Sequence, residues 1–202
     1  MPKDSQANQR ARDARRDQIV AAALELFATR GLAATKITDI AAAAQISQGL
    51  MYHYFRSKEE IFVELIRDAF AKMNAAARTL EEHPATPREK IIMAVSQLLR
   101  DLEQSERFAR TILLITQASI SAASPAQAVA IIEAQRDEPY QVVARIMRAG
   151  QRDGSVRDHD ADALALIFWT TIKGLALHRA SVGAAFVAPD PRILTHIFLT
   201  ME

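Results

Sequence analysis

Hydrophobic residues recur at a helical period along almost the whole chain, and no segment shows the sustained alternation of a half-buried strand. This pattern predicts an all-α fold of about nine helices. A long apolar stripe marks the fourth helix, which follows Ser57 and extends to about Leu80. The other helices are expected at residues 13–30, 37–44, 48–54, 88–103, 106–121, 126–152, 160–181 and 191–201.

Residues that favour helix ends set several of these boundaries. Gly31 is placed to cap the end of the first helix, and Ser47 and Ser57 to cap the starts of the third and fourth. Pro139 lies inside the range 126–152 and lacks the backbone N–H that a helix interior needs. The helix must therefore either kink there or restart with Asp137 as its cap, and the sequence leaves both alternatives open.

The second and third helices are short, and about three residues separate them behind a longer first helix. This is the spacing of a helix-turn-helix unit, in which the second short helix can enter the major groove of DNA. Ile40, Ala41 and Ile46 supply a small apolar corner between the two helices. The same spacing also fits a plain corner between two helices of a larger bundle, so the pattern alone permits two interpretations.

Composition excludes several classes of protein. Half of the 202 residues are hydrophobic and 24% are charged, which excludes a disordered chain. The chain has no cysteine, which excludes disulfides, thiolate zinc sites and a cysteine nucleophile and suits a reducing compartment. The N-terminus lacks the apolar run of a secretion signal, and the uncharged residues 111–132 hold too many polar groups for a membrane span. We therefore expect a cytoplasmic protein with no membrane contact.

Charge is distributed unevenly along the chain. Residues 1–58 carry a net charge of +4, with nine Lys and Arg against five acidic residues, and residues 59–202 carry −3. A basic head joined to a slightly acidic body is the asymmetry expected when only one end meets a polyanion such as DNA.

The segment from Ile19 to Ile66 contains the runs ALELFATRG, TKITDIAAAAQIS and QGLMYHYFRSKEEIFVELI. These runs strongly resemble the N-terminal domain of the tetracycline-repressor (TetR) family of bacterial transcription regulators. The resemblance implies a homodimer that binds palindromic double-stranded operator DNA and releases it when a small molecule enters the C-terminal domain. It implies a flexible basic arm over residues 1–12, a helix-turn-helix domain over 13–58, and a ligand-binding and dimerisation domain over 59–202. We expect the fourth helix alone to belong to both head and body.

The resemblance assigns DNA contacts to the third helix and its surroundings. Gln48, Gly49 and Leu50 match positions that face bases, and a glutamine amide can form two hydrogen bonds with adenine. The positions that match contacts to phosphates or groove edges are Tyr52, His53 and Lys58. Further phosphate contacts are expected from Lys36, Arg12, Arg15 and Arg16.

The turn between the second and third helices departs from the family pattern, since Gln45 stands where glycine is common. If Gln45 takes a left-handed conformation, its side chain costs on the order of 1 kcal/mol, which a packed corner can tolerate. The conformation of Gln45 therefore decides whether the turn keeps the family geometry.

The uncharged residues 111–132 mix Ile and Leu with isolated polar groups, as the wall of an apolar ligand cavity does. The residues expected to contact a small-molecule effector are Phe108, Thr116, Gln117, Ile120, Met147 and Trp169. Because no charged residue stands out as a counter-ion, a neutral or lipophilic effector is favoured. The same residues also fit an ordinary helical core, so both interpretations remain.

The last two helices carry stripes suited to a dimer interface. On the helix over 160–181 the stripe consists of Ile167, Thr171, Gly174 and His178, and on the last helix it includes Ile193 and Ile197. Two such helices can pair with their symmetry mates as an isologous four-helix bundle. Packing of the same faces within one chain would produce the same periodicity.

Signs of enzymatic chemistry are weak. Asp158, His159, Asp160 and Asp162 could be taken for metal ligands, but they lie at a helix start, where acidic residues are favourable without a metal. The chain has no phosphate-binding glycine loop, no nucleophile elbow and no histidine pair at metal-binding spacing. We therefore expect no enzyme, metal or cofactor, and favour a ligand-responsive repressor over a helical scaffold protein without sequence-specific DNA binding.

Overall fold

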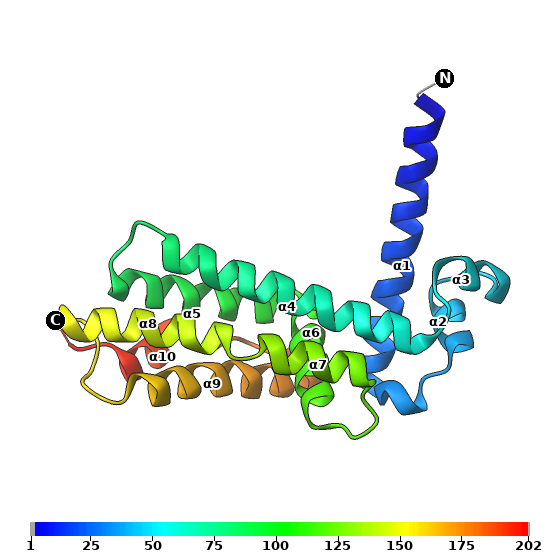
Figure 1. Cartoon of the computed structure of the whole chain (residues 1–202). Helices are drawn as coiled ribbons and strands as arrows, with labels where there is room; N and C mark the ends of the chain where they lie inside the picture. The colour runs from blue at the N-terminus through cyan, green and yellow to red at the C-terminus, as the bar shows by residue number, and fades with distance from the viewer. Residues whose placement is uncertain (1–2, 202) are drawn as a thin grey trace.

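The computed structural model describes residues 3–201 and is all-α, as predicted (Figure 1). Within this range it has ten α-helices and one short 3-10 helix, η1 (Gly183–Ala185). The α-helices are α1 (Lys3–Ala34), α2 (Ile37–Ala43), α3 (Gln48–Tyr54), α4 (Lys58–Glu82), α5 (Pro87–Gln104), α6 (Glu106–Ile120), α7 (Ala126–Gln135), α8 (Glu138–Arg152), α9 (Ala161–Val182) and α10 (Pro191–Phe198). None of the described helices is long and apolar enough to cross a membrane.

The first helix begins about ten residues earlier than predicted. Residues 3–12 of the expected basic arm are helical in the structure, and the first two residues of that arm lie outside the described range. Residues 3–12 contain neither glycine nor proline and are rich in Ala, Arg, Gln and Lys, which favour helix. Figure 1 shows this part of α1 projecting beyond the rest of the molecule. Regular helix ends before Gly31, whose φ of 78° confirms the predicted break.

The helix-turn-helix unit has the predicted boundaries to within one residue. Ser47 accepts a hydrogen bond from the Leu50 backbone N–H at 3.2 Å, which confirms it as the N-cap of α3. Gln45 has a φ of 52°, so the turn keeps its left-handed residue although a side chain is present. The backbone N–H of Ile46 then donates to the Ala41 carbonyl at 3.0 Å and closes the corner.

Pro139 splits the expected seventh helix in two. Helix α7 ends at Gln135 and α8 restarts after Asp137, so the second of the two alternatives is correct and the chain has one helix more than predicted. Asp137 occupies the N-cap position, although its side chain makes no capping hydrogen bond. Proline fits the first turn of α8, because N–H groups in a first turn have no helical partner.

The prediction that the last helix reaches Met201 is wrong. Helix α10 ends at Phe198, and Leu199 forms an antiparallel bridge with Val156. The Arg157 N–H donates to the Phe198 carbonyl at 2.9 Å, and the Thr200 N–H donates to the Ser155 carbonyl at 3.1 Å. Backbone pairing with the loop before α9 therefore replaces the last helical turn.

Buried hydrophobic residues form two cores along the length of the molecule. The head core includes Phe27, Met51, Phe55, Phe62 and Leu114. The body core includes Leu99, Ala109, Val142, Phe168 and Phe198. Helix α4 supplies residues to both, and Figure 1 shows it running from the head to the far end of the body.

The expectation that α4 alone joins head and body is wrong, because α6 also contributes to both cores. Leu114 of α6 lies in the head core and Ala109 in the body core. The Gln117 amide of α6 donates to the Ala28 carbonyl of α1 at 3.2 Å. Arg110 of α6 forms an ion pair with Glu25 of α1 at 3.4 Å. The head is therefore attached to the body through two helices.

The left-handed turn generates a stability prediction. The free energy of unfolding of the Gln45→Gly variant should be about 1 kcal/mol higher than that of Gln45→Ala, because glycine has no Cβ to strain the left-handed conformation. Urea denaturation of both variants measures the difference. Ala42→Gly, at an exposed helical position of α2, is the control and should be destabilised by roughly the same amount relative to the parent chain. A Gln45→Ala variant more stable than Gln45→Gly would contradict the account of the turn.

Candidate DNA-binding and effector sites

Helix α3 buries one face and exposes the other. Met51 is fully buried in the head core, whereas Gln48, Gly49, Tyr52 and His53 are exposed. Positions that differ by four lie on the same side of a helix, so the four exposed residues form one outward face. The structure thus brings together four of the residues predicted to contact DNA.

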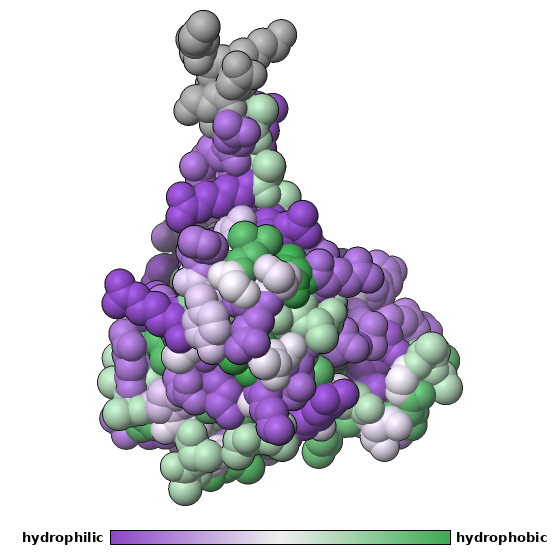
Figure 2. Space-filling model, turned by 90° about the vertical axis from the view of Figure 1, so that its right-hand side faces the viewer, coloured by the Kyte–Doolittle hydropathy of each residue, from purple (hydrophilic) through white to green (hydrophobic). Residues whose placement is uncertain are grey.

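The end of the molecule that carries α3 is largely hydrophilic (Figure 2). Hydrophobic areas interrupt it near the middle of the view and at its lower and right-hand edges. Leu50 is 37% exposed at the edge of α3, so it is available for the predicted contact with a thymine methyl group. Lys36 is also exposed, at the N-cap of α2, where its backbone N–H donates to the Asp39 carboxylate at 3.0 Å.

Lys58 is placed differently from the prediction. Its ammonium donates to the carbonyls of Leu32 and Thr35, each at 2.8 Å, and to that of Ala33 at 3.4 Å. An ammonium group has three donors, so these bonds use all of them. In this structure Lys58 therefore holds the end of α1 and the following Thr35 against the start of α4 and is not directed at a phosphate.

Arg16 also contacts other residues of the head. Its guanidinium pairs with Glu64 of α4 and lies 5.0 Å from the centre of the Phe55 ring. Arg12 and Arg15 are exposed on the projecting part of α1, where Arg15 donates to the Gln18 side chain at 2.9 Å. Of the three arginines predicted to contact phosphates, Arg12 and Arg15 therefore keep an outward position.

The six residues predicted to contact an effector do not line one cavity. Phe108 and Trp169 pack against the body core, where Met147 is fully buried. Gln117 instead contacts α1, and Ile120 is 83% exposed. Thr116 donates its hydroxyl to the Ile112 carbonyl within α6. Because α6 contributes to both cores, the predicted residues of this apolar stretch contact different parts of the molecule.

Two hollows on the surface have other linings. One, of about 300 Å³, lies between α1 and α6 and is lined by Gln18, Ala21, Ala22, Leu24, Glu25, Ala43, Arg107 and Arg110. The other, of about 460 Å³, lies between α4 and the α7–α8 break and is lined by Ala71, Asn74, Arg78, Ala134, Gln135 and Glu138. Neither includes a residue predicted to contact the effector. Asn74 lines the second hollow but was not among the predicted residues. The signal in the sequence that could have identified it is its polar side chain next to the apolar stripe of the fourth helix.

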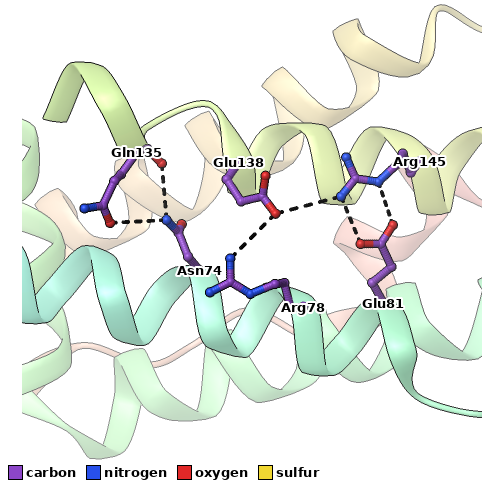
Figure 3. Close-up of polar contacts among 6 residues, drawn as sticks. All are labelled: Asn74, Arg78, Glu81, Gln135, Glu138 and Arg145. Atoms are coloured by element: carbon purple, nitrogen blue, oxygen red, sulfur yellow. Dashed lines mark hydrogen bonds and ion pairs between the residues drawn. The ribbon is translucent and has the colours of Figure 1, made fainter. Parts of the chain in front are cut away.

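The second hollow is bordered by a polar network that joins α4 to α7 and α8 (Figure 3). Arg145 of α8 forms two hydrogen bonds with Glu81 of α4, at 2.6 and 2.9 Å. These bonds lower the pKa of the Glu81 carboxyl, and burial opposes the shift. Glu138 lies 3.9 Å from Arg78 and 4.0 Å from Arg145, so it contacts both cations at long range.

The residues predicted for the dimer interface leave an apolar face on α9 and α10. Ile167, Ile193 and Ile197 are exposed, and a side chain added at Gly174 would meet no atom within 4 Å. His178 is exposed beside the Phe186 ring, and Thr171 is half-buried. Two further residues of α9, Leu166 and Leu177, are exposed next to the predicted stripe and were not among the predicted residues.

The acidic cluster at the start of α9 has structural partners. Asp160 caps α9 by accepting a hydrogen bond from the Ala163 N–H at 2.8 Å, and Asp162 pairs with Arg148. Among residues 3–201, no group of three or more His, Cys, Asp or Glu side chains is arranged to hold a metal ion.

The sequence of this chain is similar to a known protein family and to named transcription regulators. The family model described as "Bacterial regulatory proteins, tetR family" matches residues 19–65. The transcriptional repressor KstR2 of Mycolicibacterium smegmatis is 28% identical over 183 residues, which cover 86% of this chain and 87% of the relative. The transcriptional regulator BetI of Rhizobium meliloti is 36% identical over 95 residues, which cover 47% of this chain and 45% of the relative.

Solved structures share the fold over nearly the full length. The ketosteroid transcriptional regulator KstR2 of Mycobacterium tuberculosis superposes with a TM-score of 0.77 and 22% identity, covering 93% of this chain and 96% of that one. The MbdR regulator of Azoarcus sp. CIB gives a TM-score of 0.78 and 22% identity, with 90% and 95% covered. The family match shows that residues 19–65 form the helix-turn-helix domain of the TetR family of bacterial transcription regulators, and the solved structures show that the whole chain shares the fold of such regulators.

Proposed function

We propose that the protein is a ligand-responsive transcriptional repressor that binds operator DNA as a homodimer and leaves it when a small molecule binds the body. The observation that carries this proposal is the exposed polar face of α3, held rigidly by the buried Met51 within the family-matched segment. The full-length relative KstR2 is named a transcriptional repressor. The alternative of a scaffold without sequence-specific DNA binding has no comparable support.

The outward face of α3 offers two kinds of DNA contact. The Gln48 amide suits a bidentate pair of hydrogen bonds with adenine, and Gly49 permits close approach of the helix to the base edges. The Tyr52 hydroxyl, the His53 ring and the Lys36 ammonium suit phosphate oxygens, which fix position without selecting sequence. Specificity is therefore expected from Gln48 and Leu50, and affinity from the phosphate contacts.

The apolar face of α9 and α10 supports a dimer in which two copies present their heads to two half-sites. Ile193 is 61% exposed and Leu177 also 61%, and neither has a partner element covering it within the described chain. An isologous interface would bury both faces at once and relate the two α3 helices by a two-fold axis. Such an arrangement matches a palindromic operator with half-sites about 34 to 36 Å apart.

The descriptions of the structural neighbours name no common effector. One is described as a ketosteroid regulator and one as a putative fatty acid metabolism regulator, and of these three only the structure in complex with choline names a bound molecule. The six residues predicted to contact a neutral or lipophilic effector do not line one cavity. The effector of this protein must therefore be inferred from other residues of the chain.

Gln48 and Lys36 should have separable effects on DNA binding. Gln48→Ala should reduce the preference for operator over unrelated DNA by about 1–3 kcal/mol, because a base contact is lost. Lys36→Ala should weaken binding to both DNAs equally and reduce the steepness of the salt dependence by about one unit per head, because a phosphate contact is lost. Fluorescence anisotropy at several salt concentrations measures both quantities. Equal loss of preference in the two variants would contradict the assignment.

Lys58 should matter for stability more than for DNA contact. Lys58→Met should lower the free energy of unfolding by about 1–3 kcal/mol, because three carbonyls lose a charged donor. Lys72→Met is the control, since Lys72 is exposed and pairs with Asp68 only one helical turn away, and it should cost at most about 0.5 kcal/mol. Chemical denaturation measures both. If Lys58→Met kept full stability and flattened the salt dependence of DNA binding, the original phosphate assignment would be restored.

The proposed interface predicts the oligomeric state of three variants. Gly174→Leu should overpack the interface and Ile197→Asp should bury a charge in it, so both should sediment as monomers with unchanged helical content. Ile120→Asp changes an exposed hydrophobic residue at the end of α6 and should remain dimeric. Analytical ultracentrifugation and circular dichroism provide the measurements. Folded, dimeric Gly174→Leu and Ile197→Asp proteins would exclude this face as the interface.

A further inference from the structure

The hollow between α4 and the α7–α8 break contains a buried polar group that the fold does not satisfy. Asn74 is only 6% exposed, and its side-chain oxygen Oδ1 has no hydrogen-bond partner. Its nitrogen Nδ2 donates weakly to the Gln135 carbonyl at 3.5 Å and to Gln135 Oε1 at 3.4 Å. A buried acceptor without a donor destabilises the fold, so a group bound at the edge of this hollow that donates to Oδ1 would be favoured.

A loosely held cation lies beside this acceptor. Arg78 is one helical turn after Asn74 on α4, and its side chain is 54% exposed. Its partner Glu138 is 3.9 Å away, beyond hydrogen-bond distance, whereas the neighbouring pair Arg145 and Glu81 is closely bonded (Figure 3). An exposed pair at this distance contributes little, so Arg78 can turn to another anion at small cost.

The spacing of these groups defines the ligand. Asn74 offers an acceptor and Arg78 a cationic donor, about 5–6 Å apart at their Cβ atoms as expected for neighbours one turn apart. The rest of the lining consists of the small residues Ala71 and Ala134 with Gln135 and Glu138, and the hollow of about 460 Å³ lies within the size range of small-molecule sites. Because Glu138 would repel an anion, the carboxylate of a ligand is placed on the side of Arg78 that faces away from it. A ligand that satisfies both groups carries a carboxylate and, a few atoms away, a hydroxyl group.

We propose that this hollow binds a small hydroxycarboxylic acid, with its carboxylate on Arg78 and its hydroxyl donating to Asn74 Oδ1. Because Oδ1 is buried, the hydroxyl can reach it only when side chains that line the hollow shift. The inference rests on the proposed function, because it identifies the acid as the small molecule to which the repressor responds. Both contacts of the acid lie on α4, and the acid takes Arg78 away from Glu138 of α8, so it changes the attachment of a helix whose other half lies in the head core.

A matched pair of probes tests the chemistry. Racemic 3-hydroxybutyrate and butyrate differ only in the hydroxyl group, and each is titrated into the full chain while backbone amide resonances are followed by NMR. We expect saturable shifts from 3-hydroxybutyrate that centre on residues 74–78 and 135–138, and binding of butyrate about tenfold weaker. Equal binding of the two acids, or no saturable binding of 3-hydroxybutyrate, would overturn the proposal.

Variants test the two residues. Asn74→Leu and Arg78→Gln should each weaken 3-hydroxybutyrate binding by about tenfold or more, whereas Arg67→Gln, an exposed arginine of the same helix outside the hollow, should leave it unchanged. Asn74→Leu should melt no lower than the parent chain, because leucine removes the unsatisfied acceptor. A clearly lower melting temperature, or undiminished binding in either variant, would assign Asn74 or Arg78 a purely structural role and overturn the proposal.

The two proposals fail in different ways. Operator binding by the parent chain is measured without any acid, so its absence contradicts the repressor function and leaves the acid site standing. If the chain binds operator and 3-hydroxybutyrate does not bind in the hollow, the acid site is wrong and the repressor function stands. If the acid binds as expected, it should weaken operator binding, and operator should weaken acid binding by the same factor.

Discussion

The position of α3 depends on the burial of α4 in two successive hydrophobic cores. Ile61, Phe62 and Ile66 of its first half lie in the head core with Met51 of α3, and Ala77 of its second half lies in the body core. Because cores are close-packed, α4 cannot rotate or shift at one end without displacing neighbours at the other. The polar contacts reinforce this attachment. Lys58 binds the end of α1 and the following Thr35 to the start of α4, and Arg16 binds α1 to Glu64.

Helix α6 gives the head a second attachment and changes how a signal would cross the molecule. Leu114 packs in the head core, Gln117 donates to the α1 backbone, and Ala109 belongs to the body core. A displacement of α4 relative to α6 would therefore tilt the head, whereas a common displacement of both helices would carry the head along unchanged. The α7–α8 break lies against α4, where Glu81 and Arg145 form a fixed contact, so a ligand in the adjacent hollow would contact α4 directly and α6 only through its packing against α4 and α7.

The parts of the structure that follow local rules could be predicted from the sequence. Ser47 and Ser57 cap the helices they were expected to cap, and α3 has the predicted bounds, because side-chain capping is a contact between near neighbours in the chain. The failures involve distant partners. Lys58 matches a phosphate-binding position, but carbonyls more than twenty residues away take its donors. The predicted effector residues share an apolar stretch, yet α6 carries them across two cores. Asn74 is recognisable as a site residue only once α7 is seen to end beside it.

Native-state hydrogen exchange across a denaturant series tests most directly whether the two cores form one cooperative unit. The decisive amides are those of Phe27 and Met51 in the head core and of Val95 and Val142 in the body core. The account predicts that all four exchange through the same global opening, with a common free energy and a common dependence on denaturant. If Phe27 and Met51 exchanged through a separate opening of lower free energy and weaker denaturant dependence, the head would unfold independently and the shared helices would not couple it to the body.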